Sequence, residues 1–154
     1  EEEKYRIESS LLEKSGSMFM QEVIMKPKVE FRIYLTQNME FITSDNFIGI
    51  KRAGYGLTEK VSSMTDIHLS PAEINALIQD EKFQAIITKL IKMLRELKHV
   101  VISVDLYRML DTGEWGIFEY SNEYSIEGLS LEHSLKLREQ TNYSLKYIYN
   151  NKVK

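Results

Sequence analysis

Residues 82–98 constrain the fold more than any other part of the chain. Apolar side chains recur there at intervals of three and four residues, namely Phe83, Ile86, Ile87, Leu90, Ile91, Leu94 and Leu97. This spacing places them on one stripe of an α-helix. The polar side of that helix carries Lys89, Lys92, Arg95 and Glu96. Such a helix is stable in water only when another apolar surface covers its stripe, so we expect it to pack on a core.

A β-sheet is the expected partner surface. Residues 29–35 alternate apolar and polar side chains, which is typical of a half-buried strand. One face carries Val29, Phe31, Ile33 and Leu35, and the other carries Glu30, Arg32 and Tyr34. The remaining strands are predicted at residues 18–25, 40–44, 47–52, 99–106 and 115–121. The order of these elements favours an α+β fold, with a mainly antiparallel sheet and flanking helices.

Two further helices and three connecting segments complete the expected organisation. Ser70-Pro71-Ala72-Glu73 reads as an N-cap, a proline in the first turn and an acid three residues after the cap. A short helix is expected at residues 131–139, followed by a tyrosine-containing segment at 143–149. Residues 1–17 form a lead-in segment, residues 53–64 a loop, and Asp111-Thr112-Gly113 a turn.

Composition narrows the class of protein. The chain has 154 residues, of which 43% are hydrophobic, so we expect it to bury a core and to be one domain or a compact piece of a larger one. A net charge of −3 argues against nonspecific nucleic-acid binding. The absence of cysteine excludes a disulfide scaffold and thiolate metal sites, and it fits a cytoplasmic protein. No apolar run reaches the ~18–20 residues of a membrane span, so no membrane partner is expected.

The hairpin around the Asp111–Gly113 turn brings two acids together. A register symmetric about Thr112 pairs Asp105 with Glu119, and Ser103 with Ser121. Directly opposed Cβ atoms lie about 4.5–5.5 Å apart, where two like charges destabilise the sheet unless they are neutralised. A divalent cation, a basic side chain or a shared proton would neutralise them. A slipped register or a solvated acidic pair is the structural alternative.

The oxygen-rich composition of this hairpin favours Mg²⁺ among the metals. Carboxylates without cysteine suit a hard cation, and Mg²⁺ is usually held by one or two carboxylates plus substrate phosphates. Lys51 and Arg52 form a second constellation. Because neighbouring strand residues point to opposite faces, only one of them can share the face of Glu30 and Arg32. The chain contains no P-loop, no GxGxxG and no GxSxG motif.

Four stretches, read together, resemble the C-terminal half of the ATP-grasp fold. Members of that superfamily include D-alanine–D-alanine ligase, glutathione synthetase and the ligases that add glutamate to protein tails. Residues 19–24 are similar to its hinge strand, 29–32 to its acid-x-Arg strand, 48–52 to its basic strand end, and 103–106, 116–122 and 126–129 to its metal-binding hairpin and the loop that follows. The likeness runs from about Met18 to Leu129.

The resemblance implies a ligase that joins a carboxylate to an amine through an acyl phosphate. ATP and Mg²⁺ are the implied cofactors, and the implied partner is a carboxylate substrate, either a small molecule or a peptide. The implied metal ligands are Asp105, Glu119 and either Ser121 or Asn122. The residues implied to line the adenine are Gln21, Glu22, Val23 and Ile24. Glu30 would accept hydrogen bonds from the ribose, and Arg32, Lys51 and Arg52 would serve the phosphates.

Two features depart from the family pattern. Its E-x-N motif reads here as Glu119-Tyr120-Ser121, with Asn122 one residue later. Nothing before Met18 corresponds to the family's N-terminal domain or to its small central subdomain, so residues 18–154 would be a partial ATP-grasp-like domain. These departures leave two alternatives open, a non-catalytic module that binds a nucleotide or a protein, and a purely structural interaction domain.

Overall fold

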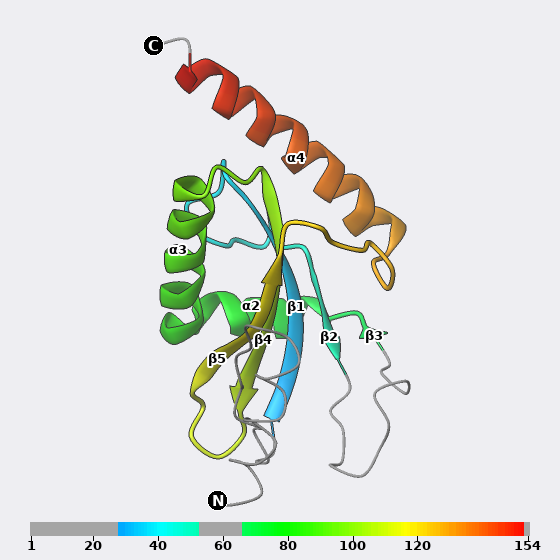
Figure 1. Cartoon of the computed structure of the whole chain (residues 1–154). Helices are drawn as coiled ribbons and strands as arrows, with labels where there is room; N and C mark the ends of the chain where they lie inside the picture. Colours follow the sequence, from blue (N-terminus) through cyan, green and yellow to red (C-terminus); the bar gives the residue numbers. More distant parts are fainter. Residues whose placement is uncertain (1–27, 53–65, 153–154) are drawn as a thin grey trace, which may run out of the picture.

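A five-stranded antiparallel sheet forms the centre of the computed structural model, which describes residues 28–52 and 66–152 (Figure 1). The strands, in the spatial order β3-β2-β1-β4-β5, are β1 (Lys28–Thr36), β2 (Gly49–Arg52), β3 (Asp66–Ile67), β4 (Val101–Met109) and β5 (Trp115–Ser121). The helices are α2 (Pro71–Gln79), α3 (Glu81–Glu96) and α4 (Leu131–Lys152). The α+β class with antiparallel pairing is confirmed. The expected lead-in, the strand at 18–25 and the loop at 53–64 lie outside the described residues.

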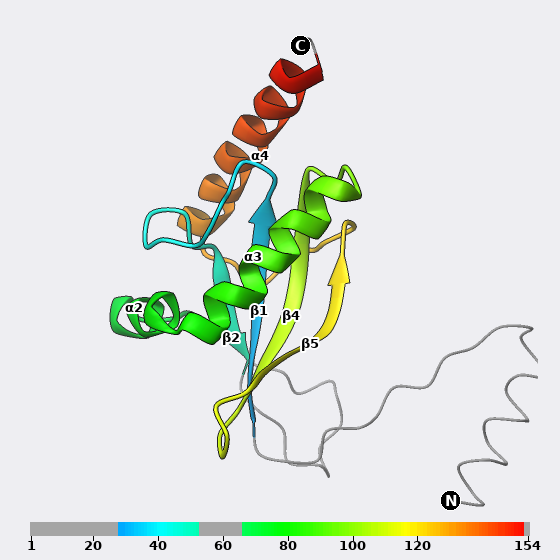
Figure 2. The same ribbon diagram turned by 90° about the vertical axis from the view of Figure 1, so that its left-hand side faces the viewer.

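The main core lies between α2, α3 and one face of the sheet (Figure 2). The apolar stripe of α3 meets the predicted apolar face of β1, where Ile33 and Leu35 are fully buried. Strand β4 adds Ile102, Val104 and Leu106 to the same core. The prediction that residues 82–98 form a core-covering helix is therefore confirmed, with the helix ending at Glu96.

Helix α4 packs against the other face of the sheet, at the end where β1 finishes and β4 begins (Figure 1). Leu137 of this helix contacts a small cluster formed by Tyr34, Ile48 and Val101. The Ser144 hydroxyl donates to the Val100 carbonyl at 3.1 Å and accepts from the Gln37 amide at 2.9 Å. Only this end of the face is covered by a described helix, and the opposite end carries charged residues.

The helix start predicted at Ser70 is confirmed in detail. The Ser70 hydroxyl accepts from the Glu73 amide, and the Glu73 carboxylate accepts from the Ser70 amide at 2.8 Å. This capping box satisfies two amides that a helix end leaves without partners. Helix α3 begins directly afterwards, and Asp80 caps it by accepting from the amides of Lys82 and Phe83.

Several predicted boundaries are wrong. Residues 40–44 form no strand, because Thr43 and Asn46 exchange hydrogen bonds between side chains and backbone amides and thereby close a turn. The second strand consequently starts at Gly49 rather than at residue 47. The segments at 131–139 and 143–149 belong to one helix, because no glycine or proline interrupts the residues between them.

Within the described ranges, none of the three helices has both the length and the apolar character that crossing a bilayer requires.

Candidate functional site

A row of charged side chains crosses the face of the sheet that α3 does not cover. Arg32 of β1 lies directly opposite Asp105 of β4, and Asp105 lies directly opposite Glu119 of β5. Directly paired residues project their side chains from the same face. The predicted pairing of Asp105 with Glu119 is therefore confirmed, as is that of Ser103 with Ser121.

The hairpin is symmetric only as far as this row. The register shifts between Asp105 and Leu106, so that Leu106 pairs with Ile117 and Phe118 becomes the extra residue of a β-bulge. The Phe118 ring lies against the Tyr107 ring, with 4.7 Å between the centroids. Lys28 Nζ lies 5.8 Å from the centroid of Phe118. The bulge thus places an aromatic pair beside the two carboxylates.

Two arginines from neighbouring strands hold Asp105. Arg32 donates from Nε to Oδ1 at 2.7 Å and from Nη2 to Oδ2 at 2.8 Å, which is the bidentate geometry of strong guanidinium–carboxylate pairs. Arg52 Nη1 donates to Oδ2 at 3.1 Å. The three side chains are only 13–19% exposed. A basic bridge, one of the three expected ways to neutralise the acidic pair, is therefore present at Asp105.

The Glu119 carboxylate is not held by other side chains as that of Asp105 is. Its side chain is exposed, and no hydrogen bond or ion pair joins it to any residue of the ranges that the structure describes. Both arginines therefore bind Asp105, and the Glu119 carboxylate has no direct partner among the described residues.

The two consecutive basic residues of β2 separate as the strand period requires. Arg52 is on the face of Asp105, whereas Lys51 is on the α2 face, where its Nζ lies 3.3 Å from Glu73 Oε1. Lys51 therefore does not join the row of Arg32, Asp105 and Glu119. Of the two, only Arg52 shares a face with the acidic pair.

Glu30 belongs to the next row across the sheet. It lies directly opposite Arg52 on one side and Tyr107 on the other, and its Oε1 is 3.7 Å from Lys28 Nζ. Glu30, Arg52 and the aromatic pair thus surround the carboxylate row on one side. Sequence reasoning did not identify Tyr107, although its position two residues after Asp105 places it on the same face. Phe118 reaches this face only through the bulge, for which the sequence pattern carries no signal.

The two candidate oxygen ligands after Glu119 differ. Ser121 occupies the row next to Glu119, but its hydroxyl donates to the Glu123 carbonyl and accepts from the Glu123 amide at 3.1 Å. Asn122 follows the strand and is exposed. The predicted adenine-lining residues, Gln21, Glu22, Val23 and Ile24, lie outside the described residues.

In the described part of the chain, no group of three or more acidic or histidine side chains is arranged to hold a metal ion. Two carboxylates, completed by oxygens from a phosphate ligand, are the donor set that the geometry offers. No family model, curated protein or solved structure matches this chain.

Proposed function

We propose that the chain is an ATP- and Mg²⁺-binding domain of the ATP-grasp type, from a ligase that joins a carboxylate to an amine through an acyl phosphate. The observation that carries the proposal is the pairing of Asp105 with Glu119 on a sheet face that also presents Arg32 and Arg52. Carboxylates for a hard cation and guanidinium groups for phosphates are the two requirements of phosphoryl transfer from ATP.

The donor set fits Mg²⁺. A carboxylate offers about four lone-pair positions, and the arginines use three at Asp105, two from Arg32 and one from Arg52. One position remains at Asp105, and the exposed carboxylate of Glu119 supplies further oxygens. Bound there, Mg²⁺ would neutralise charge on the phosphates of ATP.

The arginines have a second task in this proposal. A cation held by Asp105 would weaken the hold of this carboxylate on the guanidinium groups, because all of these positive charges would compete for the same two oxygens. Arg52, whose contact with Asp105 is the longer one at 3.1 Å, would be the group that turns to a phosphate or to the substrate carboxylate, while the bidentate Arg32 would keep Asp105 in place. Glu30 accepts hydrogen bonds from ribose hydroxyls, and Tyr107 and Phe118 offer an aromatic surface for the base.

The chemistry of such a ligase has two steps. The substrate carboxylate attacks the γ-phosphorus, so ADP leaves and an acyl phosphate forms. An amine then attacks the acyl carbon, the bond to phosphate breaks, and the amine loses a proton as the amide forms. The site described above serves the first step by positioning charge around the transferred phosphoryl group.

Titration calorimetry of the full chain with ATP, with and without Mg²⁺, tests the proposal. We expect binding that requires Mg²⁺, and we expect Glu119→Gln to weaken it by about tenfold or more, at least the cost of losing an outer-shell partner at a metal site. Glu114→Gln is the matched control, because Glu114 is an exposed carboxylate in the turn of the same hairpin. Absence of heat with ATP and Mg²⁺, or equal losses in the two variants, would contradict the proposal.

A non-catalytic nucleotide-binding module is the second candidate. Ser121 favours it, because its hydroxyl is already engaged with the Glu123 backbone and a serine is a weaker metal ligand than an asparagine amide oxygen. Phosphate release separates the two candidates. A ligase forms phosphate from ATP when a suitable carboxylate and amine are supplied, whereas the module binds Mg²⁺-ATP without turnover in the same mixtures.

A further inference from the structure

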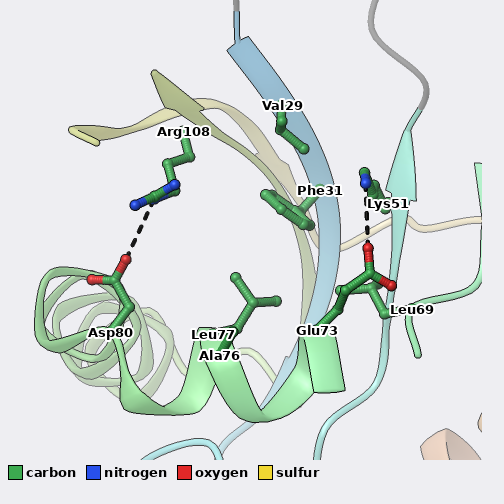
Figure 3. Close-up of a pocket in the computed structure, with 9 residues that line it drawn as sticks. All are labelled: Val29, Phe31, Lys51, Leu69, Glu73, Ala76, Leu77, Asp80 and Arg108. Carbon is green, nitrogen blue, oxygen red and sulfur yellow. Dashed lines mark hydrogen bonds and ion pairs between the residues drawn. The ribbon is translucent and has the colours of Figure 1, made fainter. Parts of the chain in front are cut away.

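A cavity of about 250 Å³ lies on the α2 side of the sheet, the face opposite to the row of Arg32, Asp105 and Glu119 (Figure 3). Helix α2 forms one wall, and β1 with its neighbours forms the other. The apolar lining consists of Val29, Phe31, Leu69, Ala76 and Leu77. The charged lining consists of Lys51, Glu73, Asp80 and Arg108. We call this space the α2 cavity. At about 30 Å³ per water molecule, it has room for about eight non-hydrogen atoms.

Two ion pairs frame the α2 cavity. Lys51 Nζ lies 3.3 Å from Glu73 Oε1, and Arg108 Nε lies 3.5 Å from Asp80 Oδ2. Figure 3 shows both pairs bordering the apolar side chains. The Lys51 and Arg108 side chains are 33% and 44% exposed, so both cations reach solvent. Long, single-point contacts between partly exposed charges hold little free energy.

The two carboxylates are well supplied with donors. Glu73 Oε2 accepts from the amide and the hydroxyl of Ser70, and these bonds lower the pKa of Glu73, with a smaller contribution from Lys51. Asp80 accepts from the amides of Lys82 and Phe83 and from the indole Nε1 of Trp115 at 2.9 Å. Both carboxylates therefore stay in place, satisfied by their helix ends, whether or not a cation is beside them.

The Lys51 and Arg108 side chains, in contrast, have more N–H donors than described acceptors. A lysine ammonium carries three N–H groups and an arginine guanidinium carries five. Among the described residues, Lys51 makes one hydrogen bond and Arg108 makes one ion pair. The border of the α2 cavity thus combines carboxylates that already accept several hydrogen bonds with cations that keep N–H groups without a described partner. The N–H groups that remain on the two cations are available to an anionic ligand.

We propose that the α2 cavity binds a small organic carboxylate, with its apolar body against Phe31 and Leu77 and its carboxylate accepting from Arg108. The apolar lining matches a short hydrocarbon body, and the spare N–H groups match a single anionic head. The proposal is independent of the nucleotide site, because the two lie on opposite faces of the sheet and share no side chain.

Hexanoate, with eight non-hydrogen atoms, is the probe, and hexanol and hexylamine are the neutral and cationic analogues. Amide chemical shifts in a two-dimensional NMR titration of the full chain locate the binding. Tryptophan fluorescence measures affinity, because the single Trp of the chain donates to Asp80 and contacts Phe31 at 5.4 Å between ring centroids. We expect hexanoate to shift the amides of Phe31, Ala76 and Leu77 saturably, and to bind about tenfold more tightly than hexanol, the factor of one charge-assisted hydrogen bond.

Two variants on α2 make the test specific. Ala76→Phe places a ring in the cavity and is expected to abolish hexanoate binding. Ala72→Phe, one turn earlier on the same helix, is exposed and does not line the cavity, so it is expected to bind as the wild type does. Arg108→Gln is expected to remove most of the preference for hexanoate over hexanol. Unshifted cavity amides, equal affinity for all three probes, or unchanged binding by Ala76→Phe would each overturn the proposal.

Discussion

Single polar residues fix the positions of whole helices and strands in this domain, and Asp80 is the main example. Its Oδ1 caps α3, and its Oδ2 accepts from the indole of Trp115 on β5. Burial raises the pKa of Asp80, but the hydrogen bonds from Trp115, Phe83 and Lys82 and the charge of Arg108 outweigh it. The net pKa is therefore lower than the ordinary value of 3.8.

We expect Asp80→Ala to lower the free energy of unfolding by about 1–2 kcal/mol, the usual cost of losing an N-cap. Because the folded-state pKa of Asp80 is lowered, its stabilisation is present above the ordinary pKa and is lost as the pH falls through the folded pKa. Urea denaturation at pH 7 and at pH 3 measures both effects. The difference between wild type and variant should shrink in acid. Asp45→Ala, an exposed acid in a turn, is the control and should change stability little.

His133 predicts a pH dependence in a different range. Burial lowers its pKa below the ordinary value of 6.5, and the positive charge of Lys136 lowers it further. Its buried Nδ1 has no hydrogen-bond partner among the described residues, and its ring meets Phe47 edge-on. Between the folded pKa and 6.5 the unfolded chain binds the proton more readily, so the free energy of unfolding should fall as the pH falls through this window.

His133→Gln should reduce that slope. Urea denaturation at several pH values between 7.5 and 5 measures the free energy of unfolding for both proteins. Titration of the histidine ring protons by NMR reports the pKa directly. Equal slopes for wild type and variant, or a His133 pKa above 6.5, would show that burial does not control this side chain.

At the scale of elements, local sequence patterns predicted the helices, strands and pairings that depend on one segment, or on two segments joined by a tight turn. The stripe of residues 82–98 and the alternation of residues 29–35 were sufficient for α3 and β1, and the turn at 111–113 was sufficient for the pairing of Asp105 with Glu119. A basic bridge was one of the expected arrangements, but the sequence could not show that Arg32 and Arg52 form it, because this requires β1 to lie between β2 and β4. That spatial order depends on the packing of the whole sheet.

Helix α4 is attached through a buried polar contact, and this attachment can be tested. The fully buried Ser144 hydroxyl joins the Gln37 amide to the Val100 carbonyl. We expect Ser144→Val to lower the free energy of unfolding by about 1–3 kcal/mol, because both backbone groups lose a buried partner. Asn142→Ala, at an exposed position of the same helix, should cost far less. Thermal and urea denaturation compare the two variants, and similar losses would mean that Ser144 does not anchor the helix.

For the molecule as a whole, the two faces of the sheet differ in chemistry and in role. The α3 face is an apolar core, whereas the other face places Glu119, which has no described partner, directly opposite Asp105, and opposed like charges are unfavourable to the extent that the two arginines do not offset them. Residues retained at a cost to stability are typical of functional sites. The exposed Glu119, with no described partner, is where that cost can be measured.

We expect Glu119→Gln to leave the free energy of unfolding unchanged or to raise it by a few tenths of a kcal/mol without ligand, because it removes repulsion with Asp105. With Mg²⁺-ATP the order should reverse. A ligand at 100 times its dissociation constant stabilises the folded state by about 2.7 kcal/mol, and the variant should lose most of that gain. Thermal denaturation with and without Mg²⁺-ATP measures both states. If Glu119→Gln destabilises the ligand-free protein and leaves the ligand-dependent gain intact, Glu119 is a structural residue and the acidic pair does not bind the metal.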